Sequence, residues 1–67
     1  MSKLAYSREM GKRYQEAFDL LMSHKITVNE YSNIEKEYIE SLEQATEEVD
    51  ESNIDLHLAF ISYMKNN

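Results

Sequence analysis

The feature that most constrains the fold is a stripe of apolar side chains between residues 28 and 49. Its members recur at steps of three or four residues, the spacing that places side chains on one face of an α-helix. They are Val28, Tyr31, Ile34, Tyr38, Leu42, Ala45 and Val49. Thr27, with Glu30 three residues later, matches a capping box, in which each side chain accepts a hydrogen bond from the other residue's backbone N–H. We therefore predict a helix over residues 28–49.

A similar stripe lies in the first third of the chain. Its members are Tyr6, Met10, Tyr14, Ala17, Phe18 and Leu21. Ser2 can cap this helix, which we expect over residues 3–24. Because only residues 24–27 separate the two helices, they must fold back on each other as an antiparallel hairpin.

In such a hairpin, residues that face one another have numbers that sum to about 51. This register matches apolar residues in four pairs: Phe18 with Ile34, Tyr14 with Tyr38, Met10 with Leu42, and Tyr6 with Ala45. It also sets bases against acids: Lys3 near Glu47 and Glu48, Arg8 near Glu43, and Lys12 near Glu40. The helices are therefore expected to be complementary in both packing and charge.

The connection between the helices has a recognisable pattern. Residues 24–31 read HKITVNEY, and residues 20–42 resemble short helical hairpins of the SHOCT type, in which a GxITxEEY-like turn joins two helices. The resemblance covers about a third of the chain, and His24 or Lys25 stands where the glycine before the isoleucine is usual. It implies shared turn chemistry rather than membership of that family.

A third helix is expected over residues 53–65, with Ser52 or Asn53 as its cap. Its apolar residues surround most of the helix: Ile54, Leu58 and Ile61 on the side expected to pack on the hairpin, and Leu56, Phe60, Tyr63 and Met64 on the opposite side. The second group predicts an interface with a second copy or another protein. Proline is absent and glycine occurs once, which argues against β-hairpins. We predict a single all-α domain over residues 1–67: an antiparallel helical hairpin plus a shorter third helix, a three-helix bundle that dimerises.

The residues that could support catalysis or metal binding are few. The chain has no cysteine and two histidines, His24 and His57, and neither histidine belongs to a metal-binding pattern. Carboxylate pairs such as Glu40 with Glu43 are present, but so small a bundle has little room for a pocket that would separate their pKa values. No nucleophile motif or glycine-rich phosphate loop occurs. We therefore expect no enzyme activity, no cofactor and no metal.

The five tyrosines divide between two roles. Tyr14, Tyr31 and Tyr38 fall on the hairpin stripes and are expected in the core, whereas Tyr63 is the better interface residue. The sequence has no signal-peptide pattern and no apolar run of membrane-spanning length. We expect a cytoplasmic protein without a membrane partner.

Charge is the most informative functional feature. The net charge is −6, with +2 in residues 1–25 and −8 in residues 26–67. The acidic face comprises Glu37, Glu40, Glu43, Glu47, Glu48 and Glu51. It can be a solvated surface partly neutralised by Lys3, Arg8 and Lys12, or a surface that meets a basic partner.

These observations favour a small acidic interaction module, a homodimer that regulates or inhibits another protein. An alternative is an acidic nucleic-acid mimic, of the kind phages encode, that blocks a basic DNA- or RNA-binding protein. A third is a helix-turn-helix regulator in which Lys3, Arg8, Lys12 and Arg13 contact phosphates. The charge of −8 over residues 26–67 repels DNA and argues against direct nucleic-acid binding.

Overall fold

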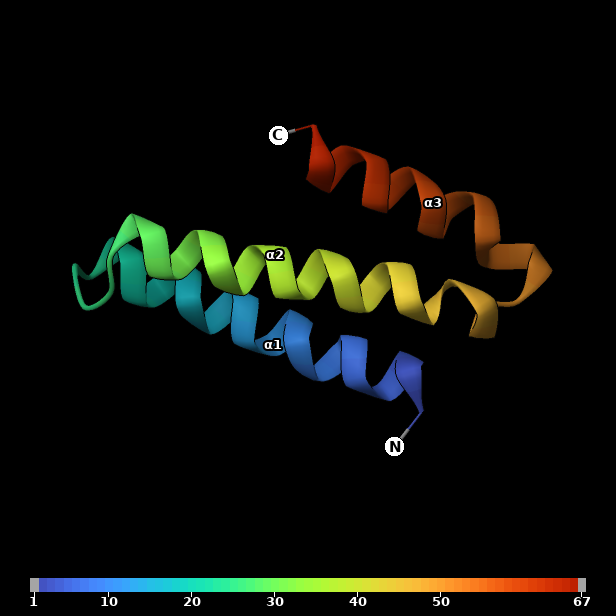
Figure 1. Cartoon of the computed structure of the whole chain (residues 1–67), viewed down its shortest axis with the longest axis horizontal. Coiled ribbons are helices and arrows are strands. Elements are labelled where there is room, and N and C mark those ends of the chain that lie inside the picture. Colours follow the sequence, from blue (N-terminus) through green and yellow to red (C-terminus); the bar gives the residue numbers. More distant parts are fainter. Residues whose placement is uncertain (1, 67) are drawn as a thin grey trace.

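The computed structural model describes residues 2–66 and confirms an all-α fold built on a helical hairpin. The elements are α1 (Lys3–Met22), α2 (Val28–Ala45), a short 3₁₀ turn η1 (Thr46–Glu48) and α3 (Glu51–Lys65). Figure 1 shows α2 in the middle, with α1 on one side and α3 on the other. The described chain measures 40 × 27 × 14 Å, so its shortest dimension is little more than one helix diameter.

Both hairpin helices begin at the predicted caps. The Ala5 N–H donates to the Ser2 hydroxyl at 3.0 Å, so α1 starts at Lys3. At α2, the Glu30 N–H donates to Thr27 Oγ1 at 3.1 Å, and the Thr27 N–H donates to Glu30 Oε1 at 3.2 Å. These two reciprocal bonds confirm the capping box.

The turn after α1 begins earlier than predicted, because α1 ends at Met22 rather than at His24. His24 adopts a left-handed backbone conformation with φ of 60°. The His24 N–H donates to the Leu21 carbonyl at 3.0 Å, and the Lys25 N–H donates to the Leu20 carbonyl at 2.8 Å. These two bonds form a Schellman motif, whose left-handed position is usually glycine. His24 therefore stands at the position of the glycine in the GxIT pattern.

The end of α2 also differs from the prediction. The helix stops at Ala45 rather than at Val49, and the Thr46 N–H donates to the Glu43 carbonyl in a tighter turn. This leaves the Leu42 carbonyl to accept hydrogen bonds from the Thr46 hydroxyl at 3.2 Å and from His57 Nε2 at 2.9 Å. Val49 then takes an extended conformation. Hydrogen bonds from these two side chains thus replace the next backbone hydrogen bond of the helix, and the chain turns toward α3.

The hairpin core is narrow, and its seam on α1 is rotated from the predicted stripe. Ser7, Met10 and Ala17 are buried, whereas Tyr6 and Phe18 are 47% and 48% exposed. The predicted stripe counted only apolar residues and therefore omitted Ser7, whose small side chain, like that of Ala17, allows close packing. On α2, the buried residues are Ser41, Leu42 and Ala45, while Val28 lies at the solvent-exposed start of the helix.

The predicted register is confirmed where Tyr14 and Tyr38 stack, with ring centroids 5.5 Å apart. Gly11 lies beside this contact. A Cβ atom at Gly11 would lie 3.2 Å from a ring carbon of Tyr38, closer than ordinary van der Waals contact. The single glycine of the chain therefore permits the Tyr38 ring to lie against α1.

The third helix contacts the hairpin only weakly and faces it differently from the prediction. It begins at Glu51 after Asp50, which makes no side-chain capping bond, so neither Ser52 nor Asn53 is the cap. Ile61 and Met64 are buried, whereas Leu58 is exposed. Steps of three and four residues link Ile54, His57, Ile61 and Met64, and the His57 bond to the Leu42 carbonyl holds this face toward α2. Met64 is therefore a core residue rather than an interface residue.

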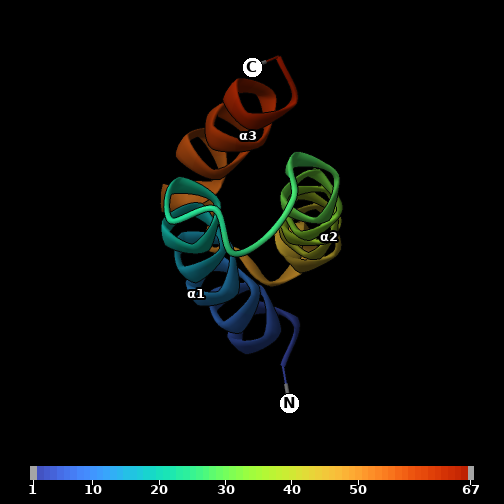
Figure 2. The same cartoon turned by 90° about the vertical axis from the view of Figure 1, so that its left-hand side faces the viewer.

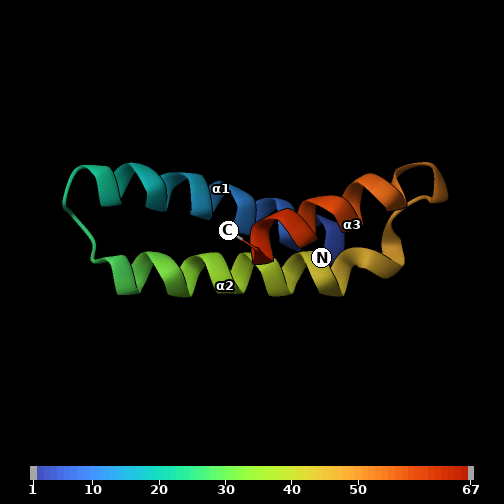
Figure 3. The same cartoon turned by 90° about the horizontal axis from the view of Figure 1, so that it is seen from above.

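The outer helices α1 and α3 lie on the same side of α2. Viewed from the hairpin turn, α2 lies to one side of both α1 and α3 (Figure 2). Figure 3 shows that α3 runs over the part of the hairpin remote from the turn, so the turn end extends beyond it. The third helix thus covers the hairpin incompletely.

Candidate functional site

A groove runs along α1 on the side that faces α3, and we call it the aromatic groove. Its middle section has a volume of about 350 Å³ and is lined by Arg8, Gly11, Lys12, Tyr14, Gln15, Tyr38 and Phe60. Two adjoining hollows share lining residues with this section, and we include them in the groove: one reaches Leu4, Leu56 and His57, and the other reaches Phe18 and Tyr31. Three helices contribute to the groove, so no single stripe of the sequence could reveal it.

Tyrosine side chains form one wall of this groove. The Tyr31 hydroxyl donates to the Tyr14 hydroxyl at 2.9 Å, and the Tyr14 hydroxyl donates to Glu35 Oε2, also at 2.9 Å. The Tyr14 and Tyr31 ring centroids are 5.4 Å apart. This network joins α1 to α2 and keeps the polar ends of half-buried tyrosines satisfied.

The surroundings of these tyrosines favour their neutral forms. Burial raises the pKa of Tyr14 well above its usual value, and the hydrogen bonds to Tyr31 and Glu35 raise it further. Burial alone raises the pKa of Tyr38. Both phenols are therefore protonated at neutral pH, and they act as packing and hydrogen-bonding groups rather than as bases.

The predicted interface residues of α3 differ in their exposure to solvent. Leu56 and Tyr63 are 74% and 60% exposed, and Phe60 is 41% exposed. The Phe60 ring lies edge-on to Tyr38, with centroids 6.3 Å apart, which places Phe60 in the aromatic groove. Leu56, Phe60 and Tyr63 follow one another at steps of four and three, and we call them the α3 ridge. Phe60 thus belongs both to the ridge and to the lining of the groove, and Leu56 lines one end of the groove.

The six residues of the predicted acidic face are all exposed, but three have partners within the chain. Glu47 forms an ion pair with Lys3, as the register predicts. The Glu48 carboxylate accepts hydrogen bonds from the backbone N–H groups of Lys3 at 3.0 Å and Leu4 at 3.2 Å. Glu48 thus satisfies orphan donors at the positive end of α1.

The other two predicted ion pairs do not form. Glu43 is paired with Lys65 of α3 at 2.8 Å rather than with Arg8, because it lies on the side of α2 that faces α3. Lys12 lies nearest to Glu9 of its own helix, at 3.8 Å, rather than to Glu40. Within residues 2–66, Glu37, Glu40 and Glu51 make no ion pair or side-chain hydrogen bond.

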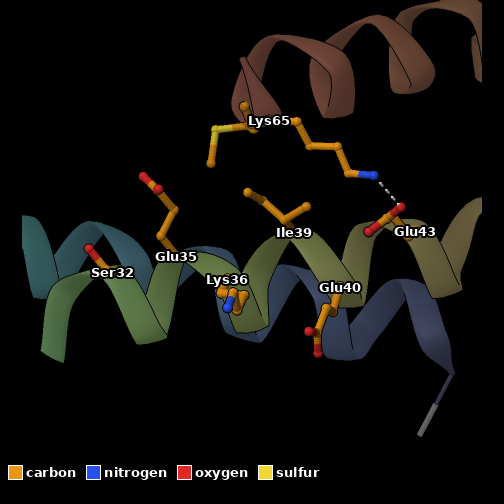
Figure 4. Close-up of a pocket in the computed structure, with 8 residues that line it drawn as sticks. Ser32, Glu35, Lys36, Ile39, Glu40, Glu43 and Lys65 are labelled. Carbon is orange, nitrogen blue, oxygen red and sulfur yellow. Dashed lines mark hydrogen bonds and ion pairs between the residues drawn. The ribbon is translucent and has the colours of Figure 1, made fainter. Parts of the chain in front are cut away.

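A second hollow lies between α2 and the C-terminal end of α3, with a volume of about 400 Å³. In Figure 4, Ile39 and Glu35 point from α2 toward α3, and the Lys65–Glu43 ion pair closes one end. Glu40 points away from α3. The hollow has an apolar floor of Ile39 and Met64 within a charged rim, and Glu40 remains available on the outer side of α2.

The two histidines have structural positions. His57 is half-buried, with Nε2 bonded to the Leu42 carbonyl and 3.1 Å from Thr46 Oγ1, and His24 forms the turn. Among residues 2–66, no three His, Asp or Glu side chains gather in a way that could hold a metal ion. No described helix is both long and apolar enough to cross a membrane.

The chain was compared with known proteins at three levels. It matches no protein-family model, no curated protein and no solved structure.

Proposed function

We propose that the protein is a non-enzymatic interaction module that acts as a homodimer and regulates or inhibits a partner protein. The observation that supports this proposal is that more apolar side chains are exposed at the surface than are buried in the core. Among residues 2–66, only six apolar side chains are buried, whereas nine large apolar side chains are between 39% and 74% exposed. A core this small is marginal for an isolated domain, and so much exposed apolar surface is typical of a protein that binds others.

The outer side of α2 is the surface proposed to meet the regulated partner. Glu37 and Glu40 are exposed and three residues apart, and neither has an internal ion pair within the described chain. Unpaired carboxylates of this kind attract a basic surface and speed its association. Glu51 adds a third free carboxylate near the start of α3.

A nucleic-acid mimic is a narrower form of this proposal. Carboxylates three or four residues apart on a helix lie about 5–6 Å from each other, a spacing comparable with phosphates along a strand. Because Glu43, Glu47 and Glu48 have internal partners, mimicry would depend chiefly on Glu37, Glu40 and Glu51. A partner that binds DNA or RNA and loses that binding when this protein is added would support the narrower form.

The test is affinity capture from a lysate with the tagged full chain, followed by mass spectrometry. The Glu37→Gln, Glu40→Gln double variant should lose the partner, because it removes two free carboxylates. A control that combines Glu9→Gln and Glu16→Gln makes the same change in net charge on α1 and should keep the partner. Equal capture by both variants, or no specific partner for the unmodified chain, would contradict the proposal.

A further inference from the structure

The single chain leaves more surface accessible than a compact monomer of this mass. The accessible surface is 5018 Å², compared with about 4,400 Å² expected for a compact monomer of this mass. The radius of gyration is 12.7 Å, compared with about 11 Å expected for a compact domain of this length. The excess, about 600 Å², approaches the roughly 800 Å² that each partner buries in a standard protein interface.

The charges around the groove are self-complementary. Arg8 and Lys12 are exposed along the α1 side, and Arg8 has no ion pair within residues 2–66. On α3, Asp55 is exposed and also unpaired in that range. A two-fold contact sets α1 of one copy against α3 of the other, so each basic edge meets an acidic edge. This arrangement offsets part of the repulsion between two chains that each carry a net charge of −6.

The aromatic groove and α3 are also similar in length. The groove follows α1 from Leu4 to Phe18, which is about 21 Å of helix at 1.5 Å per residue. The helix α3 has 15 residues and is therefore about 22 Å long. A second α3 can lie along the whole groove, including the turn end that the chain's own α3 does not cover (Figure 3).

We infer that the aromatic groove is the binding site for a second copy of this chain, with the α3 ridge of each copy seated in the groove of the other. This inference rests on the homodimer of the proposed function and names its contact surface. Leu56, which is 74% exposed in the single chain, becomes buried in the dimer. Leu58 lies outside the residues that line the groove and stays at the surface.

Sedimentation equilibrium of the full chain at tens of micromolar tests this contact. The unmodified chain should sediment as a dimer, and Leu56→Glu should raise the dissociation constant about a hundredfold or more, because two leucines leave the symmetric interface. Leu58→Glu is the matched control on the same helix and should remain dimeric. A species at the 7.9 kDa monomer mass for the unmodified chain would overturn the inference. Equal losses in the two variants would also overturn it.

A charge exchange tests the pairing of α1 with α3 separately. Arg8→Glu should weaken the dimer several-fold, and adding Asp55→Arg should restore most of the loss. Absence of any recovery would contradict the two-fold arrangement. These outcomes are distinct from failure of the regulatory function, because a monomer that still captures a partner through Glu37 and Glu40 would leave that function standing while removing the groove contact.

Discussion

The hairpin and α3 are held in place by different kinds of interaction. The hairpin is secured along its whole length by the Schellman motif and capping box at the turn, the tyrosine network in the middle, and the Glu48 carboxylate at the start of α1. The third helix depends on Ile61, Met64, the His57 bond and one exposed ion pair. The hairpin is therefore a framework, and α3 is the most weakly held of the three helices.

The largest loss of stability should come from a substitution in the hairpin core. Met10 is the one large side chain that is fully buried among the described residues. Met10→Ala should lower the free energy of unfolding by about 2–5 kcal/mol, because it leaves a cavity between α1 and α2. Urea denaturation followed by circular dichroism measures the loss. Met22→Ala, at an exposed position, should change little; an equal loss there would show that the hairpin core does not dominate stability.

The next largest loss of stability should come from a substitution that weakens the packing of α3 on the hairpin. Ile61→Ala removes much of the buried contact of α3 and should cost about 2 kcal/mol. Amide hydrogen exchange should then be fastest in residues 51–65, while the amides of α1 and α2 keep their protection. Uniform loss of protection over all three helices would mean that α3 and the hairpin unfold as one unit.

A smaller effect is expected at the start of α1. Glu48→Gln removes the negative charge that accepts hydrogen bonds from the N–H groups of Lys3 and Leu4, and should cost about 1 kcal/mol. Thermal unfolding measures the change. Glu37→Gln is the control at an unpaired acid of α2, and should have no cost. A Glu48 variant as stable as the unmodified chain would show that water replaces this contact without loss.

The turn should respond with a gain in stability. His24 has a φ of 60°, which is costly for a side-chain-bearing residue and free of strain for glycine. His24→Gly should therefore stabilise the hairpin by about 0.5–1 kcal/mol, after allowance for the greater freedom of glycine in the unfolded chain. Chemical denaturation of this variant beside Lys25→Gly decides the matter. Lys25→Gly should bring no gain, and a gain from both would point to general flexibility instead.

The tyrosine network should show the smallest change in stability at neutral pH. The pKa values of Tyr14 and Tyr38 are raised above 10.0 in the folded chain, so their contribution to stability is intact below pH 10. As the pH rises above that value, the unfolded chain loses these protons first, and the free energy of unfolding falls. Urea denaturation at about pH 8 and about pH 11 measures the fall. Tyr14→Phe should reduce the fall, and a fall of unchanged size in that variant would contradict this role of the network.

The hairpin could be predicted from sequence because its signals are local. Thr27 and Glu30 lie three residues apart, and Tyr14 and Tyr38 fall on regular stripes, so helix starts and register follow from spacing. The rotation of α1 could not be predicted in this way, because Ser7 is a polar residue that becomes buried by donating to the Leu4 carbonyl of its own helix.

The face of α3 and the state of the acidic residues depend on tertiary contacts. Apolar residues surround most of α3, so its sequence favours no single face, and the bond from His57 to Leu42 gives Met64 the buried position instead of Leu58. The acidic residues could be identified, but their roles could not. Glu48 differs from Glu40 only because the folded chain brings it to the start of α1.

The Glu48 contact also sets an order of events in folding. The carboxylate and the N–H groups that it satisfies are 45 and 44 residues apart in the chain. Closing so long a loop carries an entropic cost that is recovered only after α2 has folded back along α1. Ser2 can cap the Ala5 N–H locally from the start, but the N–H groups of Lys3 and Leu4 gain their partner only when residue 48 is in place. We therefore expect the first turn of α1 to be completed among the last parts of the hairpin.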